Sequence, residues 1–492
     1  QAEDGIRDLD SCLVGSEMCI RDRGMELARR LSRPPNHPVS DQQLQNGSRV
    51  AVIGGGPSGA FFSYFLLRLA RRLDLELDVD IYEPRYFNHL GPAGCNHCGG
   101  IVSESLVQLL AIDGINIPPG VVQRGIDSYM LHTDAGSVSI EQPQHEKRIA
   151  AVYRGGGPRG VTDIHWKSFD EFLLGLATKQ GAHIVHKMIS DVQIKAGRPA
   201  LITHDHAEQV YDLAVVATGV NSHLLERMEA LGLGFKQPGT TTAFISEFHL
   251  GEEVVRQQMG TSMHVFLLDL PRLEFAALIP KHNCVTMCLL GDDIDEELVE
   301  AFLNTPEVKS RFPADSGIPQ NTCHCFPRIN ISGADQPFID RMLFVGDSGV
   351  TRLYKDGIGA AYRTGQAAAN AALLGGVSAE DFRRHFLPAC KKISRDNTIG
   401  KLVFWVTSLI QGMPFSRRAI VRMTALEQQT SNRQRHISNI LWDVFTGSAP
   451  YREVFVKALH PAFLIQLSWN LVLSSLPFRA KTKLVEERHG SN

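Results

Sequence analysis

The stretch of sequence that decides the fold is RVAVIGGGPSG, residues 49–59. Residues 49–53 form a short apolar run of the kind that makes a buried parallel strand, and the apolar segment 60–75 predicts a helix. The glycines between them follow the pattern G-x-G-x-x-G, which permits a tight turn and a close approach of the backbone to a ligand. Because the first N–H groups of a helix have no partner inside it, such a turn presents them to an anion such as a pyrophosphate.

An acidic residue completes this pattern. The run DVDIYE at 78–83 predicts the next strand, which ends at Glu83. A carboxylate at this place can accept hydrogen bonds from the hydroxyl pair of a ribose. We therefore predict a dinucleotide site to which the following residues contribute: Gly54, Gly56, Pro57, Ser58, Gly59 and Glu83.

A second match to the glycine pattern occurs at 155–160, GGGPRG. The residues after it, 161–165, do not predict a helix, and no strand with an acidic end follows. We interpret this segment as a mobile loop. The chain then carries one dinucleotide fingerprint, which argues against a reductase with separate folds for FAD and NAD(P)H.

A similar arrangement occurs late in the chain. Residues 341–345 again predict a buried strand, Gly346 and Asp347 follow it, and a helix of small residues is predicted at 360–374. Asp347 can accept hydrogen bonds from sugar hydroxyls, and a helix that begins near Gly359 can direct N–H groups at an anionic ring or a phosphate. Two such sites, about 290 residues apart, suit a long extended cofactor better than NAD, which needs one.

Together the two motifs resemble the family of FAD enzymes with a single Rossmann fold, which includes the aromatic hydroxylases and the geranylgeranyl reductases. The resemblance implies that the first motif holds the ADP half of FAD, that Asp347 binds the ribitol, and that the later glycine turn lies against the flavin ring. The segment 211–222 resembles the family's middle motif, a strand that ends at the FAD with Ala217, Thr218 and Gly219. Thr218 stands where aromatic hydroxylases usually have Asp, which weakens the hydroxylase interpretation.

Within this family the chain is most similar to the geranylgeranyl reductases. The segment CGGIVS at 98–103 resembles a Cys-Gly segment of those reductases that lies near flavin and substrate. Cys98 is therefore the candidate catalytic residue, and Gly99 and Gly100 are candidates for contact with the cofactor.

The turn before the last helix of the FAD domain departs from the family, because Tyr354-Lys355-Asp356 replaces a Pro-containing approach. A cation at Lys355 could stabilise an anionic reduced flavin, and a solvated turn explains the same residues equally well. The resemblance places these residues of the turn at the cofactor: Lys355, Asp356, Gly357, Ile358 and Gly359.

The resemblance also implies an α/β fold with a FAD-binding Rossmann-like domain, an interleaved antiparallel β-sheet substrate domain and a C-terminal helical region. Residues 1–47 read as a disordered or non-native leader. The FAD-binding domain would comprise 48–234 and 335–378, with a substrate-domain insertion near 126–165. The substrate-binding sheet would comprise 235–334, and the helical region 379–492.

The activity implied by the resemblance is hydride transfer from reduced FAD to a C=C bond of a lipophilic substrate such as an isoprenoid, with NAD(P)H or a protein as the electron donor. One alternative is a FAD-dependent monooxygenase. An alternative of another class is a non-catalytic protein that escorts isoprenoid lipids, because the GDP-dissociation inhibitors share this fold. Intact FAD contact residues argue against the escort.

Nine cysteines in 492 residues do not indicate a disulfide scaffold, and reduced thiols in the cytoplasm are the expectation. A CxxC motif at 95–98 and a CxC motif at 323–325 could hold zinc with His97 or His324. The two halves lie about 225 residues apart and match no standard zinc spacing. We favour structural loops over a metal site or a redox disulfide, and predict no metal.

The charge is uneven along the chain. The total is -3, which argues against a nucleic-acid partner. Residues 380–492 contain 17 Lys/Arg and 8 Asp/Glu, a balance of +9, and the remainder carries -12. In this region 462–476 contains no charged residue and has one polar stripe, formed by Gln466, Asn470 and Ser474. Residues 402–410 are also apolar. The pattern suits helices on an anionic membrane surface, and buried helices explain it equally well.

Overall fold

The computed structural model describes residues 42–95, 98–141, 149–161, 167–314, 317–319, 322–429 and 435–475. The chain divides after Gln43 into two units, and the description below concerns the second, Leu44–Asn492. Nearly all of the predicted leader, the possible ligand His97 and the end of the tail after Ser475 lie outside the described residues.

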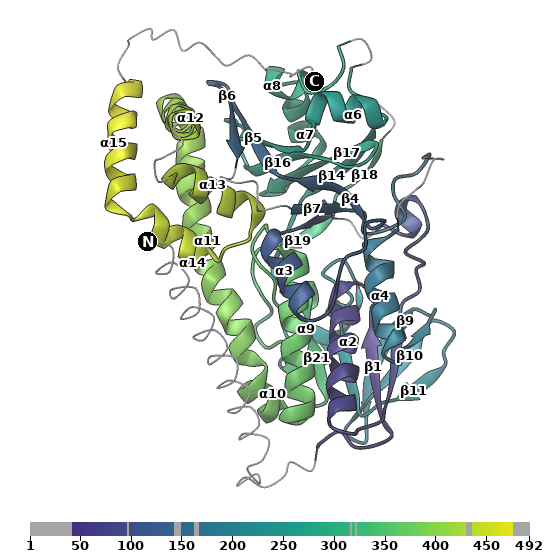
Figure 1. The fold of residues 1–492 in the computed structure, drawn as a ribbon. Helices are drawn as coiled ribbons and strands as arrows, with labels where there is room; N and C mark the ends of the chain where they lie inside the picture. Colours follow the sequence, from purple (N-terminus) through teal and green to yellow (C-terminus); the bar gives the residue numbers. More distant parts are fainter. Residues whose placement is uncertain are drawn as a thin grey trace, which may run out of the picture. The chain divides into compact units, whose positions relative to one another are not determined.

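A six-stranded sheet carries the two predicted glycine motifs (Figure 1). Its strands are parallel except for the edge strand β20. The central strands are apolar and fully buried on both faces, as expected for a parallel sheet between two layers. The strand order is β20 (Phe338–Ile339), β21 (Met342–Phe344), β12 (Leu213–Val216), β1 (Ser48–Ile53), β2 (Leu77–Tyr82) and β8 (His183–Val185).

The register brings the ends of four strands to one edge of this sheet. Ile53 pairs with both Val216 and Tyr82, and Val216 pairs with Phe344. The residues that follow these strands are the ones that the sequence motifs single out. Ligands of open α/β sheets bind at this carboxyl edge.

Helices cover one face of the parallel sheet, and a small sheet covers the other. The helices are α2 (Pro57–Arg72), α4 (Phe169–Lys179) and α9 (Gly357–Leu374). Gly365 lets α2 and α9 approach, because a Cβ there would lie 3.0 Å from the Phe62 nitrogen. The other face packs on α5 (Leu224–Ala230) and on the sheet of β9 (Ile189–Lys195), β10 (Arg198–Thr203) and β11 (Glu208–Val210).

A seven-stranded sheet forms the second layer system, in the upper part of Figure 1. Two separate stretches of the chain build it, and all of its pairs are antiparallel except β5 with β15. In order, its strands are β18 (Cys323–Cys325), β14 (Phe244–His249), β17 (Cys284–Gly291), β16 (Leu273–Pro280), β15 (Ser262–Phe266), β5 (Ser128–Thr133) and β6 (Gly136–Glu141).

Both faces of the seven-stranded sheet are buried. One face packs on α6 (Glu252–Met259), α7 (Glu296–Leu303) and α8 (Pro306–Lys309), and the other on the C-terminal helices. Short strands complete this half of the molecule: β3 (Ile101–Val102), β4 (Val122–Ile126), β7 (Ile149–Val152), β13 (Thr240–Thr242) and β19 (Arg328–Asn330). Helix α3 (Glu104–Ile112) follows β3.

The C-terminal region is helical, as its sequence predicts. It comprises α10 (Ala379–His385), α11 (Leu387–Gly412), α12 (Pro414–Gln428), α13 (His436–Thr446), α14 (Tyr451–Ala458) and α15 (Pro461–Ser475). No helix among the described residues combines the length and the apolar character that crossing a bilayer requires.

The prediction of a mobile loop at 155–160 is wrong in one respect. The segment is a loop, but it is tightly packed. The Gly157 carbonyl accepts a hydrogen bond of 2.8 Å from the Gly91 nitrogen, and the Gly156 nitrogen donates to the His89 carbonyl. A Cβ on Gly155 would lie 2.5 Å from the Gly94 oxygen. These glycines therefore serve close backbone packing between two loops.

Candidate functional site

The turn after β1 has the geometry that its glycines predict. Gly54 has φ +109°, and a Cβ there would lie 2.5 Å from the Ala217 oxygen. A Cβ on Gly59 would lie 2.0 Å from the Gly54 oxygen. Gly56 is the N-cap of α2 and Pro57 its first residue, a position where proline costs no hydrogen bond. The first motif therefore presents a bare helix N-terminus at the sheet edge.

Glu83 closes this turn from the neighbouring strand. Its carboxylate is 1% exposed and accepts a hydrogen bond of 3.0 Å from the Gly55 nitrogen. The Arg85 guanidinium pairs with the same carboxylate at 2.9 Å. The structure thus fixes the carboxylate beside the glycine turn, with Arg85 as a charge partner that the sequence pattern did not indicate.

The second motif meets the first through Gly346. This residue has φ +59°, and a Cβ on it would lie 1.8 Å from the Ser58 oxygen and 2.9 Å from the Ser58 Cβ. The Gly346 nitrogen donates to the Thr364 hydroxyl of α9 at 2.9 Å. The two glycine motifs are therefore in van der Waals contact.

The middle motif joins them through Ser348, which sequence reasoning missed. The Gly219 nitrogen donates to the Ser348 hydroxyl at 2.9 Å, and the Thr218 hydroxyl lies 3.4 Å from it. Serine in a glycine-rich turn carries no distinctive signal, so the partner of Thr218 was not predictable. All three motifs thus form one continuous surface at the carboxyl edge of the sheet.

Asp347 lies at the open part of this surface. Its side chain is exposed, but the protein around it removes part of the water from the carboxyl, which raises the pKa of Asp347 above its ordinary value. Asn330 of β19 donates to the Asp347 carbonyl at 2.9 Å, and its own side-chain oxygen is buried without a hydrogen-bond partner among the described residues. An exposed carboxylate and an unsatisfied amide oxygen fit a ligand with several hydroxyls, such as the ribitol of FAD.

The turn before α9 has its own internal partners. Asp356, at φ 53°, pairs with Arg363 at 2.5 Å and with Arg352 at 3.4 Å. Its carboxylate lies against the first turn of α9, since a Cβ on Gly359 would lie 2.1 Å from it. The positive end of the α9 dipole is thus partly compensated within the chain.

The Lys355 side chain is buried in the protein and does not lie in a solvated turn. Its amine lies 2.7 Å from the centroid of the Phe275 ring of β16, and burial lowers the pKa of Lys355 well below its ordinary value. This burial disfavours the charged form of the amine that a contact with a reduced ring would use. The neighbouring Gly357 is exposed and Ile358 is buried in the core, so Gly357 is the part of the turn open to a ligand.

The Cys98 segment faces the seven-stranded sheet. A Cβ on Gly99 would lie 2.8 Å from the Cys288 sulfur, and one on Gly100 would lie 2.0 Å from the Val152 oxygen. Only glycine therefore lets this segment approach β17 and β7 so closely. Cys98 itself lines a small cavity of about 30 Å³, which has room for about one or two water molecules.

Charged side chains that sequence reasoning missed line this cavity. Lys281 is 1% exposed, and its amine pairs with the Glu247 carboxylate at 3.0 Å and lies 4.1 Å from the centroid of the Tyr153 ring. The other Glu247 oxygen accepts from Thr286 at 2.8 Å. A buried ion pair therefore lines part of this cavity.

Arg154 adds a second cation to the cavity. Its guanidinium makes two hydrogen bonds to the fully buried Asp170 carboxylate at the start of α4. Burial lowers the pKa of Arg154, but the Asp170 carboxylate and the Cys98 sulfur raise it by more. Arg154 thus remains charged beside Cys98. The only feature of the sequence that could have pointed to Arg154 is its position directly before the glycines at 155–160.

The CxxC and CxC motifs meet at the same cavity. Cys95, Cys98 and Cys323 all line it, because β18 pairs with β14 so that Cys323 lies opposite Glu247. Burial raises the pKa of Cys325 to about 12, which disfavours the thiolate that a metal needs. Proximity of the two motifs is a tertiary result, since the sequence favoured separate structural loops.

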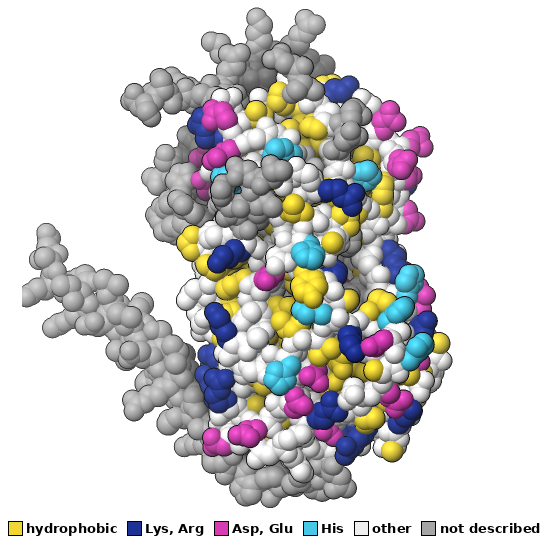
Figure 2. Space-filling view, turned by 90° about the vertical axis from the view of Figure 1, so that its right-hand side faces the viewer, with side chains coloured by type: hydrophobic (Ala, Val, Ile, Leu, Met, Phe, Trp, Pro, Cys, Tyr) yellow, Lys and Arg dark blue, Asp and Glu magenta, His cyan; other side chains and the backbone are white. Residues whose placement is uncertain are grey.

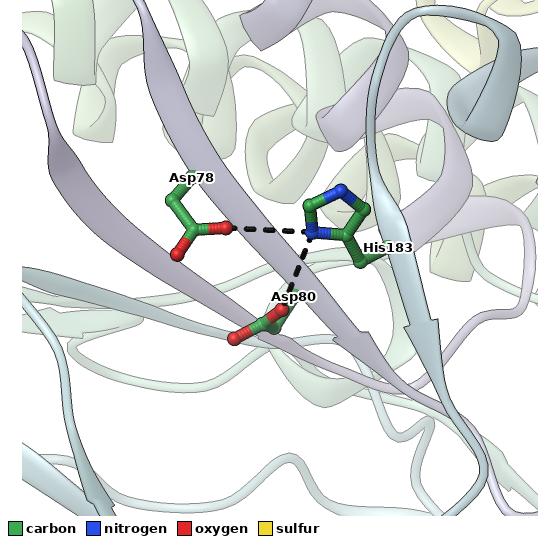
Figure 3. A group of neighbouring side chains, drawn as sticks. All are labelled: Asp78, Asp80 and His183. Atoms are coloured by element: carbon green, nitrogen blue, oxygen red, sulfur yellow. Dashed lines mark ion pairs between the residues drawn. The ribbon is translucent and has the colours of Figure 1, made fainter.

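Among the described residues, one group of three side chains has metal-ligand spacing, and it lies away from these motifs (Figure 3). His183 Nδ1 lies 3.5 Å from Asp78 and 3.9 Å from Asp80. Arg49 lies 3.7 and 3.6 Å from the same two carboxylates, and Tyr211 donates to Asp80 at 2.7 Å. The carboxylates therefore already have cationic and hydroxyl partners.

A larger cavity of about 720 Å³ lies on the opposite face of the seven-stranded sheet. Phe244, Ser246 and Phe248 of β14 line it, and these alternate along the strand with Ile245 and Glu247 of the Cys98 side. Because alternate side chains of a strand point to opposite faces, this cavity is separated from the glycine motifs by the sheet.

A scan against protein-family models found no match, and a search of curated proteins found none. The solved structures to which the chain is similar include the following three. The halogenase PltM in complex with phloroglucinol and FAD has a TM-score of 0.54 at 14% identity, covering 87% of this chain and 91% of that one. The p-nitrophenol 4-monooxygenase PnpA from Pseudomonas putida DLL-E4 has a TM-score of 0.54 at 12% identity, covering 82% and 98%. A flavoprotein/dehydrogenase from Cytophaga hutchinsonii has a TM-score of 0.54 at 14% identity, covering 84% and 99%.

The chain shares the fold of these three proteins. The predicted fold class is confirmed: an α/β fold with a Rossmann-type domain, a large sheet that is mostly antiparallel, and a C-terminal helical region. At 12–14% identity this likeness concerns the fold.

Proposed function

We propose that this chain is a FAD-dependent oxidoreductase, with FAD held along the three motifs at the carboxyl edge of the parallel sheet. The contact between Gly346 and Ser58, which joins both glycine motifs into one surface, supports an extended dinucleotide. The bare N-terminus of α2 suits the pyrophosphate, Glu83 the ribose and Asp347 the ribitol. Bound FAD would supply hydride and electron transfer.

For the reaction we propose reduction of a C=C bond in a lipophilic substrate such as an isoprenoid. The observation that carries this proposal is the Cys98 thiol in a small cavity next to Arg154 and the Lys281–Glu247 pair. Reduction adds a hydride to one carbon and a proton to the other. Cys98 would give its proton to the second carbon, and the Arg154 guanidinium would stabilise the thiolate left behind.

The size of the cavity limits what part of the substrate reacts there. With about 30 Å³ it admits a reacting group beside Cys98 and not an isoprenoid chain. The chain of such a substrate would extend outside this cavity. NAD(P)H or a protein would supply the electrons without a second dinucleotide turn of the G-x-G-x-x-G type.

A second candidate is monooxygenation, because a monooxygenase and a halogenase are among the solved structures with similar folds. The chemistry around Cys98 argues against it. Monooxygenation requires a strong oxidant at the cofactor, and cysteine thiols are readily oxidised. Three cysteines line this cavity, and Cys288 lies against Gly99.

Anaerobic flavin reoxidation separates these candidates. The purified protein is photoreduced and mixed with a polyprenyl lipid, and flavin absorbance is followed. The reductase proposal predicts reoxidation by the lipid. It also predicts that Cys98→Ala slows this step by about 10²-fold or more, which is typical of losing a general acid. Cys390→Ala is the matched control. Cys390 belongs to α11 and is buried in the core cluster that also contains residues of α2 and α9.

Two results would contradict the proposal. Reoxidation by air alone, coupled to oxygen insertion into the substrate, would indicate the monooxygenase. A purified protein that neither retains nor binds flavin would contradict both enzymes and favour the lipid escort.

A further inference from the structure

Helix α15 is packed with its polar stripe towards the protein. Asn470 is 6% exposed, and the Gln466 side-chain oxygen is buried without a partner among the described residues. On the other side of the helix, Ile465 is 71% exposed, Trp469 63% and Val472 55%. A surface helix of a globular protein normally buries its apolar stripe and exposes its polar one. Helix α15 departs from this, because its inward side combines Phe463 and Leu467 with the polar stripe and leaves Ile465, Trp469 and Val472 exposed.

Contacts to α12 hold this orientation. Helix α15 packs against α12 and α14, at the left edge of Figure 1. Arg418 of α12 donates to the Ser474 carbonyl at 3.2 Å, and Asn470 donates to the Gln466 carbonyl at 2.8 Å. The inward side of α15 is thus packed on the chain, while Ile465, Trp469 and Val472 face outward.

Helix α11 also exposes an apolar face in its second half. Leu402, Trp405, Val406 and Leu409 are 41–58% exposed. Their spacing of three and four residues places them on one side of the helix. The same side continues towards the N-terminus of α11 through Lys391 and Arg395, both exposed. A single helix face therefore changes from basic to apolar along its length.

The cations around these helices are not matched by acids. Exposed residues of α11, α12 and α14 for which the described part of the chain shows no ion pair are Lys391, Lys392, Arg395, Lys401, Arg418, Arg422 and Arg452. Acidic partners are engaged elsewhere, since Asp443 pairs with Lys457 and Asp396 with Arg352. This leaves a basic border to the exposed apolar side chains.

We propose that the outward faces of α11 and α15 form a docking surface for an anionic lipid bilayer. Exposed Trp with Leu, Ile and Val is the composition that enters the interface of a bilayer, and unmatched Lys and Arg attract anionic headgroups. A second copy of the chain is the competing occupant. It would bring one basic border against another, which is unfavourable. The proposal does not depend on the reaction that the enzyme catalyses.

Vesicle co-sedimentation of the full-length protein tests this. Vesicles of phosphatidylcholine alone are compared with vesicles of equal parts phosphatidylcholine and phosphatidylglycerol. We expect binding to the anionic vesicles with a blue shift of tryptophan fluorescence. Ile465→Gln/Trp469→Gln should lower the partition coefficient by about tenfold or more, because two large apolar side chains no longer leave water. The control Ile112→Gln/Met188→Gln changes two exposed apolar residues elsewhere, 79% and 50% exposed, and should bind as the wild type does.

A charge variant tests the basic part of the surface. Lys391→Gln/Arg395→Gln should lower binding to the anionic vesicles by about tenfold, and by much less at high salt. Unchanged binding of the Ile465/Trp469 variant would overturn the proposal. So would a wild-type protein that ignores anionic vesicles and forms a dimer that this variant dissociates, since the face would then be an interface between two copies.

Discussion

Replacing Gly346 by alanine tests whether the two glycine motifs are joined as the structure has them. At φ +59°, a new Cβ would lie 1.8 Å from the Ser58 oxygen and 2.9 Å from the Ser58 Cβ. Rotation of the Ser58 side chain relieves the first contact but not the second. The N-terminus of α2 would therefore have to move away from the end of β21, at the place proposed for FAD.

The expected loss of stability has two parts. An alanine at positive φ costs about 1 kcal/mol, and overpacking of a closely packed contact costs about 1–3 kcal/mol. Gly346→Ala should thus lower the free energy of unfolding by about 2–4 kcal/mol. Gly219→Ala is the matched control, because its φ is +72° and no atom lies within 4 Å of the added Cβ. It should lose about 1 kcal/mol.

Urea unfolding of the apoprotein measures these losses, and titration with FAD measures the affinity, which should fall further for Gly346→Ala than for the control. Ser58→Gly/Gly346→Ala should recover part of the excess loss, seen as a coupling energy in a double-mutant cycle. Equal losses for Gly346→Ala and Gly219→Ala, without coupling to Ser58, would refute the contact between the motifs.

Two further predictions concern a binding residue and acid stability. Glu83→Gln should weaken FAD binding by about tenfold, because an amide accepts more weakly from a ribose and leaves Arg85 without its charge partner. Calorimetric titration measures the affinity for FAD. An unchanged affinity would exclude Glu83 as a ribose ligand. The His132–His264 pair, joined at 2.8 Å and 2% exposed at each residue, should make the fold acid-sensitive. Burial lowers the pKa of His132 to about 2 and that of His264 to about 3 from 6.5, so the unfolded chain binds protons first. The contribution of the pair to the free energy of unfolding is then fully present above pH 6.5. Below this pH it falls, by about 2 kcal/mol per histidine at pH 5. Between pH 8 and pH 5, His132→Gln/His264→Gln should lose about 4 kcal/mol less of its free energy of unfolding than the wild type, as measured by urea unfolding. The control His223→Gln, at a side chain that is 90% exposed, should match the wild type. Equal pH slopes for the double variant and the wild type would contradict this account.

The sequence alone was sufficient where local geometry sets the structure. The glycines at 54–59 and the apolar run before them define a strand, a turn and a helix, because a Cβ at Gly54 or Gly59 would collide with nearby backbone. At Gly346 a Cβ would instead collide with the Ser58 side chain, which belongs to the other motif. Strand, turn and helix at each glycine motif could therefore be predicted from short-range rules, and the fold class followed from the resemblance to a known family.

Side-chain partners from distant segments could not be predicted. Arg154, Glu247 and Lys281 reach the Cys98 cavity from three separate places in the chain, and charged residues in a sequence do not reveal their burial. Lys355 illustrates the same limit, because its turn reads equally well as a flavin contact or a solvated loop. In the structure its amine is buried over Phe275, a residue of another sheet.

The C-terminal helices show the division most clearly. The sequence determined that 462–476 is an uncharged helix with a narrow polar stripe, because that follows from composition and a period of 3.6 residues. It left open whether the apolar or the polar side faces outward. Only the packing of α15 on α12 and α14 decided this, because the direction of a helix face depends on which neighbour it contacts, and here the contacted side combines the polar stripe with Phe463 and Leu467.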